Sequence, residues 1–250
     1  MEIFWTIFLF VIGMTFGSFF NVVGLRVPKN IPFTTDRSYC PNCHTQLKWY
    51  ELIPVFSYLL LFGKCRTCKN RISPLYPIIE LITGLLFAYS YFVIGFEVEL
   101  FAALIFMSLL MIIFVSDMKY MLIPNKILLF FLPFVILARI ISPLTPWYDA
   151  IIGGVVGFGL IAIIILLSNG GMGAGDMKLF GIIGMILGWQ NTLLTFFFAA
   201  LFGAIIGGIL LIFKMIKRKQ PIPFGPYIVI GAIISYFYGK DIISLYLTLF

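Results

Sequence analysis

Charged residues are scarce in this chain. Only 11% of its 250 residues are Asp, Glu, Lys or Arg, whereas 62% are hydrophobic. An ordinary soluble domain has about 25% charged and about 45–50% apolar residues. This composition excludes an ordinary soluble domain, and the long apolar runs predict membrane-spanning helices rather than a soluble core. We expect no nucleic-acid partner.

The N-terminus lacks the features of a secretory signal peptide. The first apolar run, Ile3–Val23, has neither a basic start nor a small-residue cleavage site, so we predict a retained helix. Later apolar runs predict further spans at about 77–94, 100–116, 127–141, 150–167, 177–189, 192–213 and 226–250. The predicted fold is an all-α polytopic membrane protein with about eight transmembrane helices.

Basic residues are unevenly placed, which predicts an orientation in the membrane. Eight of the 17 Lys and Arg lie between Arg26 and Arg71, and four more lie between Lys214 and Lys219. Because cytoplasmic loops are enriched in basic residues, these loops are expected inside and both termini outside. Arg139, near the outer end of a span, is the exception. We divide the chain into a first helix (1–25), a cytosolic loop domain (26–76) and a transmembrane bundle (77–250).

Two aspartates lie at the ends of apolar runs, where a carboxylate is costly and indicates function. Asp117 ends the third predicted span, and Asp176 begins the sixth within GMGAGDMK. The predicted topology places both at the cytosolic boundary, at similar depth. Two adjacent carboxylates share one proton, so one can activate water while the other protonates a carbonyl oxygen. This is the chemistry of an aspartic peptidase.

Simpler roles for both aspartates are open at this stage. A Gly-rich turn with one Asp, here with glycines at 170, 171, 173 and 175, is a common helix N-cap. Asp117 could pair with Lys119 or Lys126. From helix dipoles we hypothesise that Asp176, near a helix N-terminus, is ionised and that Asp117, near a helix C-terminus, holds the proton.

All four cysteines lie in the basic loop. Cys40 and Cys43 form one C-x₂-C pair, and Cys65 and Cys68 form a second after 21 intervening residues. Two such pairs complete a tetrahedral thiolate site for structural zinc. Disulfides or redox chemistry are the alternatives, but a reducing cytosol disfavours disulfides. His44 is adjacent and could substitute as a ligand, although a solvated loop histidine is the simpler interpretation.

The chain resembles the type IV prepilin peptidases, membrane aspartic proteases of the GxGD class, along nearly its whole length. The matching motifs are FGSFFNVVGLRVP, the paired CxxC loop, the segments that flank and follow it (KWYELIPVFSYLLLFGKCRTCKNRIS and YPIIELITG), DMKYMLIPN, GAGDMK and PFGPY. Glu51 stands where Asn or Asp is expected. The resemblance implies removal of the short basic leader of type IV prepilins or pseudopilins at the cytosolic face of the bacterial inner membrane. Such substrates serve pili, competence or secretion.

The resemblance also implies roles for individual residues. Asp117 and Asp176 become the catalytic pair. Many family members then methylate the new N-terminus with S-adenosylmethionine, which would be a second cofactor beside zinc. Candidates for methyl transfer, leader recognition or another substrate contact are Gly17, Asn21, Arg26, Pro28, Glu80 and Lys178. Helix packing and capping explain Gly17 and Asn21 equally well, and a structural partner explains Glu80.

Two observations argue against assigning these roles from the resemblance alone. The loop has no G-x-G-x-x-G turn, so a methyl-donor site would have to be built at the membrane face. The loop from Arg26 to Arg71 is also strongly basic, which should repel a basic leader and attract anionic lipid. A proton-coupled transporter using the two aspartates is the alternative function. A membrane scaffold whose zinc loop recruits a partner is a third.

Overall fold

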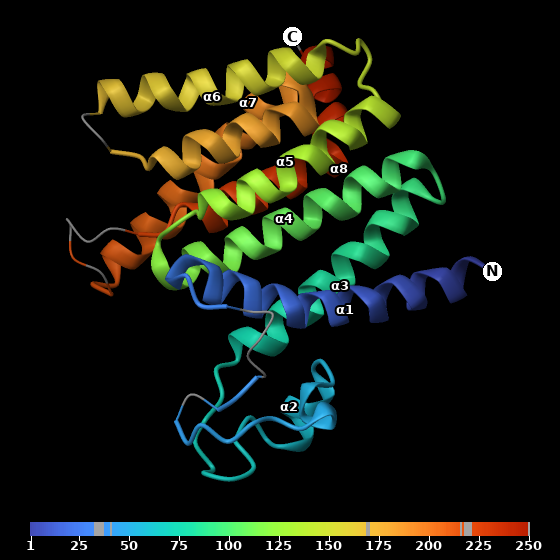
Figure 1. Ribbon diagram of the computed structural model, residues 1–250. Coiled ribbons are helices and arrows are strands. Elements are labelled where there is room, and N and C mark those ends of the chain that lie inside the picture. Colours follow the sequence, from blue (N-terminus) through green and yellow to red (C-terminus); the bar gives the residue numbers. More distant parts are fainter. Residues whose placement is uncertain (33–37, 41, 169–170, 216, 218–221, 250) are drawn as a thin grey trace. The chain divides into compact units, whose positions relative to one another are not determined.

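The computed structural model describes residues 1–32, 38–40, 42–168, 171–215, 217 and 222–249; Gly170 and part of the second basic cluster lie outside them. The described residues are helical apart from turns and two isolated β-bridges. The helices are α1 (Glu2–Arg26), α2 (Phe56–Leu60), α3 (Leu75–Ile94), α4 (Val98–Tyr120), α5 (Asn125–Ile141), α6 (Asp149–Leu167), α7 (Ala174–Ile212) and α8 (Gly225–Leu249), with short 3-10 turns η1 (Val27–Lys29) and η2 (Trp49–Leu52) (Figure 1).

The helix content confirms a polytopic membrane protein. In the part of the chain that is described, six helices are long and apolar enough to cross a membrane. Helix α5 has 17 residues, and α7 has 39 with a break at Gly188. Counting α5 and the two halves of α7 separately gives the approximate total of eight predicted from the sequence.

The chain divides into two compact units, Met1–Val115 and Ser116–Phe250. This division was not foreseen, and the three segments proposed from the sequence remain a prediction. In the first unit α1 packs against α3 through small residues. A Cβ added to Gly13 would lie 2.8 Å from the Gly84 Cα, and one added to Gly17 would lie 2.8 Å from the Glu80 Cα. Glycines four residues apart allow helix backbones to approach this closely in a membrane.

In the second unit α6 packs against the first half of α7, and α8 packs against α7. The α7 chain reverses at Gly188, where φ is +77°, and Figure 1 shows its darker second half returning past the first. A straight helix of 39 residues would extend about 58 Å, far beyond a bilayer of about 30 Å. The reversal at Gly188 agrees with the expectation of two separate spans at 177–189 and 192–213, which correspond to the two halves of α7.

Arg139, the exception to the charge pattern, stabilises this reversal. The residue is 9% exposed, and its guanidinium donates hydrogen bonds to the carbonyl oxygens of Ile186 (2.7 Å) and Ser142 (3.1 Å). Across the break, the Asp149 carboxylate accepts the Trp189 N–H at 3.4 Å. A cation at the end of one half-helix and an anion at the start of the next both match the helix dipoles.

Candidate active site and metal centre

Asp117 lies in the last turn of α4, which continues to Tyr120. Its side chain is 5% exposed, and its Oδ2 accepts the backbone N–H of Gly225 at 2.7 Å. Gly225 is the first residue of α8, where N–H groups lack partners within the helix. A Cβ on Gly225 would lie 2.7 Å from the same oxygen, so only glycine allows this approach. Asp117 on α4 therefore caps the N-terminus of α8.

Asp176 is the third residue of α7 and is 9% exposed. Its Oδ2 accepts the N–H of Gly173 at 3.1 Å, which is one half of a capping box. Asp176 therefore contributes to the cap of α7 from its third position, whereas the N-cap residue is Gly173. Among the described residues, this is the one hydrogen bond of the carboxylate, so its Oδ1 keeps free acceptor capacity.

The two carboxylates are electrostatic neighbours, since the negative charge of Asp117 acts directly on Asp176. The segment 121–124 follows α4 and leads into α5. A Cβ on Gly175 would lie 2.9 Å from the Ile123 Cβ, which shows how closely the α7 start approaches this segment. Lys178 Nζ donates to Asn125 Oδ1 at 2.9 Å. The fold therefore brings together residues 59 positions apart in the sequence.

The dipole argument made from the sequence is incomplete for Asp117, because it considered α4 alone. Although Asp117 is close to the C-terminus of α4, it binds the N-terminal amide of α8. Both carboxylates therefore face the positive end of a helix dipole. Two buried carboxylates in such positions can share one proton and together activate a water molecule.

The four cysteines of the first unit form a second centre. Their sulfur atoms all lie within 4.8 Å of one another, with Cys40–Cys68 at 3.8 Å and Cys43–Cys65 at 3.9 Å. Four sulfurs around zinc at about 2.3 Å would be about 3.8 Å apart in a tetrahedron. The sulfurs of a disulfide are about 2.05 Å apart, and all four cysteines are free. The cluster fits a metal ion.

Each cysteine pair is built as the same turn. In the first pair, Cys40 N–H donates to Thr45 O and His44 N–H donates to Cys40 O. In the second pair, Cys65 N–H donates to Asn70 O and Lys69 N–H donates to Cys65 O. His44 (φ 55°) and Lys69 (φ 57°) occupy matching left-handed positions just after each pair. His44 is exposed and stacks on Tyr39, with ring centroids 5.7 Å apart, and it is not part of the cluster.

Local hydrogen bonds prepare two of the thiols for metal binding. Hydrogen bonding to Thr45 lowers the pKa of the Cys43 thiol to about 6, and the backbone N–H of Cys68 lowers the pKa of Cys65. The pKa of the Cys40 thiol is raised: backbone N–H groups of Cys43 and Asn42 lower it, but burial and neighbouring sulfurs raise it more. A bound cation would favour the thiolate form at all four positions.

Three of the weaker candidates meet between α1 and α3. Asn21 is 1% exposed and donates from Nδ2 to Tyr76 O at 3.1 Å, while its Oδ1 has no partner. Glu80 is 8% exposed; it accepts the Val55 N–H at 2.7 Å and bonds to Ser18. Gly17 packs against Glu80, as expected for close helix contact. Buried polar groups in membrane helices indicate function.

The remaining candidates have other contacts. Arg26 ends α1 and donates to Pro32 O at 3.2 Å, and Pro28 lies in η1. Lys178 belongs to the second unit, with Asn125 as its partner. Sequence reasoning missed the contributions of Gly225 and Asn125, although both lie in motifs that it noted, PFGPY and DMKYMLIPN.

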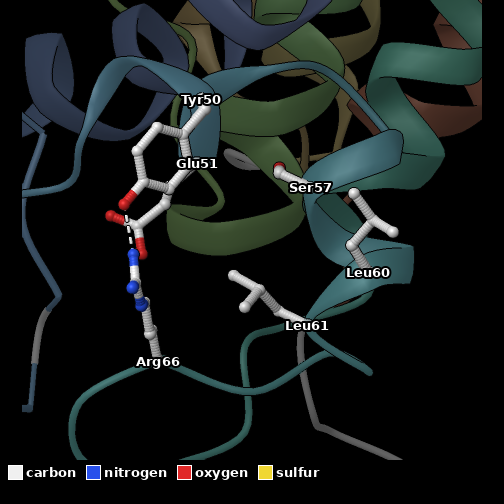
Figure 2. Close-up of a pocket in the computed structure, with 6 residues that line it drawn as sticks. All are labelled: Tyr50, Glu51, Ser57, Leu60, Leu61 and Arg66. Carbon is white, nitrogen blue, oxygen red and sulfur yellow. Dashed lines mark hydrogen bonds between the residues drawn. The ribbon is translucent and has the colours of Figure 1, made fainter.

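One cavity in the loop of the first unit has a volume of about 240 Å³. Figure 2 shows its lining: Tyr50, Glu51, Ser57, Leu60, Leu61 and Arg66. Sites that enclose ligands of cofactor size usually occupy about 300–1,000 Å³. The volume of this cavity lies below that range.

Two family models match successive parts of the chain. A family model described as "Bacterial Peptidase A24 N-terminal domain" matches residues 11–94, and one described as "Type IV leader peptidase family" matches residues 104–208. A prepilin leader peptidase/N-methyltransferase of Bacillus subtilis (strain 168) is 45% identical over 239 residues, 96% of this chain and 96% of the relative.

More distant relatives carry the same name. The protein of Pseudomonas aeruginosa is 32% identical over 264 residues (94% of this chain, 91% of the relative), and that of Xanthomonas campestris pv. campestris is 31% identical over 264 residues (94% and 92%). No solved structure matches the chain. With its two family regions matched in order and its relatives aligned from end to end, the chain belongs to the type IV leader peptidase family.

Proposed function

We propose that this protein is a membrane aspartic endopeptidase that removes the short basic leader from type IV prepilins or pseudopilins. The observation that supports this proposal most is the pair Asp117 and Asp176. Both are buried, each is anchored through one oxygen by a helix N-terminal amide, and they interact electrostatically. The curated relatives are named prepilin leader peptidase/N-methyltransferase, which agrees with a leader-removing peptidase.

In this proposal the two carboxylates share the steps of hydrolysis. One carboxylate removes a proton from water, whose oxygen attacks the carbonyl carbon of the scissile peptide bond. The other donates its proton to the carbonyl oxygen, and collapse of the tetrahedral intermediate delivers a proton to the leaving amine. The anchored Oδ2 atoms fix the two side chains, and the Oδ1 atoms supply the reacting positions.

N-methylation of the newly exposed N-terminus is the second proposed activity, since the curated relatives are named for both. S-adenosylmethionine would supply the methyl group when bound. The buried cluster of Gly17, Asn21 and Glu80 is proposed to receive the substrate amine, because Glu80 can attract an ammonium and Asn21 Oδ1 can accept a hydrogen bond. Arg26, Pro28 and Lys178 are proposed as substrate contacts.

Zinc is proposed as a structural ion of the loop, held by Cys40, Cys43, Cys65 and Cys68. Four thiolates fill a tetrahedral site and leave no position for substrate. The protein is proposed to lie in the bacterial inner membrane with both termini outside, the loop and the aspartates at the cytosolic face, and anionic lipid around the basic loop. The comparisons give no support to a proton-coupled transporter.

The test uses a purified prepilin-like substrate and the protein in detergent or vesicles. Intact mass spectrometry should show leader loss with the wild type and none with Asp117→Ala or Asp176→Ala. Asp241→Ala, at an exposed position of α8, is the matched control and should cleave normally. Leader loss that persists in both aspartate variants would remove the protease proposal, and the mass of the product reports methylation separately.

A further inference from the structure

The segment Ile53–Phe62, here called the apolar segment, presents its large side chains outward. Phe56 is 59% exposed, Leu59 62%, Leu60 78% and Phe62 87%, and the segment contains no buried residue. It does not form a small core for the loop. Contiguous exposed apolar side chains of this size mark a surface that contacts a membrane or another molecule.

A hydrogen bond fixes the level of this segment along α3. The Val55 N–H donates to Glu80 Oε2 at 2.7 Å, and Val55 holds φ at 62°, an unusual value for a β-branched residue. Glu80 lies five residues after the start of α3 at Leu75, which is about 7.5 Å along the helix. Since α3 is a candidate membrane span, the apolar segment is tethered beside its first turns, at the level of the membrane surface.

The surroundings of the segment carry positive charge and an interfacial aromatic residue. Lys48, Lys64, Lys69 and Arg71 are all exposed, and Glu51 is the sole acidic residue between 48 and 74. Trp49 is 79% exposed. Basic side chains attract anionic headgroups, and tryptophan is enriched where headgroups meet acyl chains.

The cavity described above is lined by both charged and apolar side chains. Figure 2 shows Arg66 directed toward Tyr50 and Glu51 on one side, with Leu60 and Leu61 on the other. Arg66 hydrogen-bonds the Tyr50 hydroxyl, while Glu51 accepts the Lys48 N–H at 2.8 Å. A guanidinium next to leucines suits a lipid phosphate with the beginning of its acyl chains.

We propose that the apolar segment inserts into the boundary between headgroups and acyl chains of an anionic bilayer, with the basic residues around the cysteine cluster lying on the headgroups. A basic leader peptide is a poor occupant, because these lysines and arginines would repel it. The insertion holds the cysteine loop at the membrane surface. This inference does not depend on peptidase activity.

The test places one tryptophan in the full-length protein, with Trp5, Trp49, Trp147 and Trp189 changed to Phe. One variant carries Leu60→Trp in the apolar segment, and its matched control carries Thr67→Trp, an exposed position between Cys65 and Cys68. Both are reconstituted in phosphatidylglycerol-containing vesicles whose lipids bear bromine on the upper acyl chain. Zinc content verifies the fold, and Leu59→Trp replaces Leu60→Trp if that variant loses zinc.

Insertion to about 5–10 Å predicts that bromine reduces the Leu60→Trp emission about twofold, with a blue shift. The Thr67→Trp emission should change little and should be quenched more strongly by acrylamide in water. Equal acrylamide quenching of both positions, without lipid quenching, would overturn the proposal. A blue shift that appears only after addition of a prepilin would also overturn it, because the segment would then bind substrate.

Discussion

The cysteine cluster of the first unit and the aspartate pair of the second both join distant parts of the chain, but by different means. The cysteine pairs lie in two copies of one local turn, and the four sulfurs have the spacing of a tetrahedral ion site. The aspartates lie in unrelated elements, and each is fixed by one backbone N–H at the start of a helix. The arrangement of the cysteines suits a bound ion, whereas the arrangement of the aspartates depends on the packing of helices.

This difference predicts that damage to one centre leaves the other intact. Asp117→Asn and Asp176→Asn remove an ionisable partner while keeping the shape of the side chain. We expect each to reduce cleavage at least about a thousandfold, because neither carboxylate can replace the other. Zinc content should remain that of the wild type. Single-turnover cleavage followed by mass spectrometry, together with metal analysis, measures both quantities, and a loss of zinc in these variants would contradict the separation.

The packing around Asp117 is the next place to test. Gly225→Ala places a methyl group within 2.7 Å of the carboxylate and displaces it. We expect cleavage to fall about ten- to a hundredfold, since a displacement of about 1 Å can cost this much. Gly208→Ala, where nothing lies within 4 Å of the added atom, is the matched control and should cleave at the wild-type rate. Equal activity of the two variants would show that the Gly225 approach is unimportant.

The cysteine cluster should respond in the opposite way. Cys43→Ser removes one thiolate, so bound zinc should fall to a small fraction of the wild-type content and the loop should become sensitive to limited proteolysis. Cleavage should fall less than about tenfold, because the aspartates keep their anchors. Metal analysis and a protease time course give the result, with Thr67→Ser as control. Unchanged zinc in Cys43→Ser would exclude the metal site.

The smallest effect is expected at the contact between Lys178 and Asn125. This hydrogen bond joins the α7 start to the segment that follows Asp117, but it is exposed. Lys178→Met should lower cleavage about two- to fivefold, in keeping with a net value of about 1 kcal/mol for one hydrogen bond. If Lys178 instead binds substrate, KM should rise without a change in kcat, and Asn125→Ala should not reproduce the effect.

Much of this architecture was predictable because apolar runs and basic loops obey strong physical constraints. The runs identified nearly every span, and the C-x₂-C spacing identified the cysteine cluster. The spans expected at 177–189 and 192–213 already implied a reversal. Its position at Gly188, where φ is positive, and its contact with Arg139 were less accessible, because charge statistics marked Arg139 only as misplaced.

The surroundings of the aspartates could not be read from local sequence. The bond from Gly225 to Asp117 joins residues 108 positions apart, and no local pattern predicts which helix start will meet a given carboxylate. That contact adds the dipole of α8, which the argument from the sequence did not include, to that of α4 at Asp117. The outward orientation of the apolar segment is likewise shown by the exposures of Leu60 and Phe62 and not by its sequence.

The measurement that tests the central claim most directly is a double-mutant cycle on Asp117 and Asp176. Single-turnover cleavage of one prepilin would be compared for the wild type, Asp117→Asn, Asp176→Asn and the double variant. Two carboxylates that act as one unit predict that the double variant is no slower than the slower single variant. Losses that multiply in the double variant would show that the two aspartates act independently and would contradict the account.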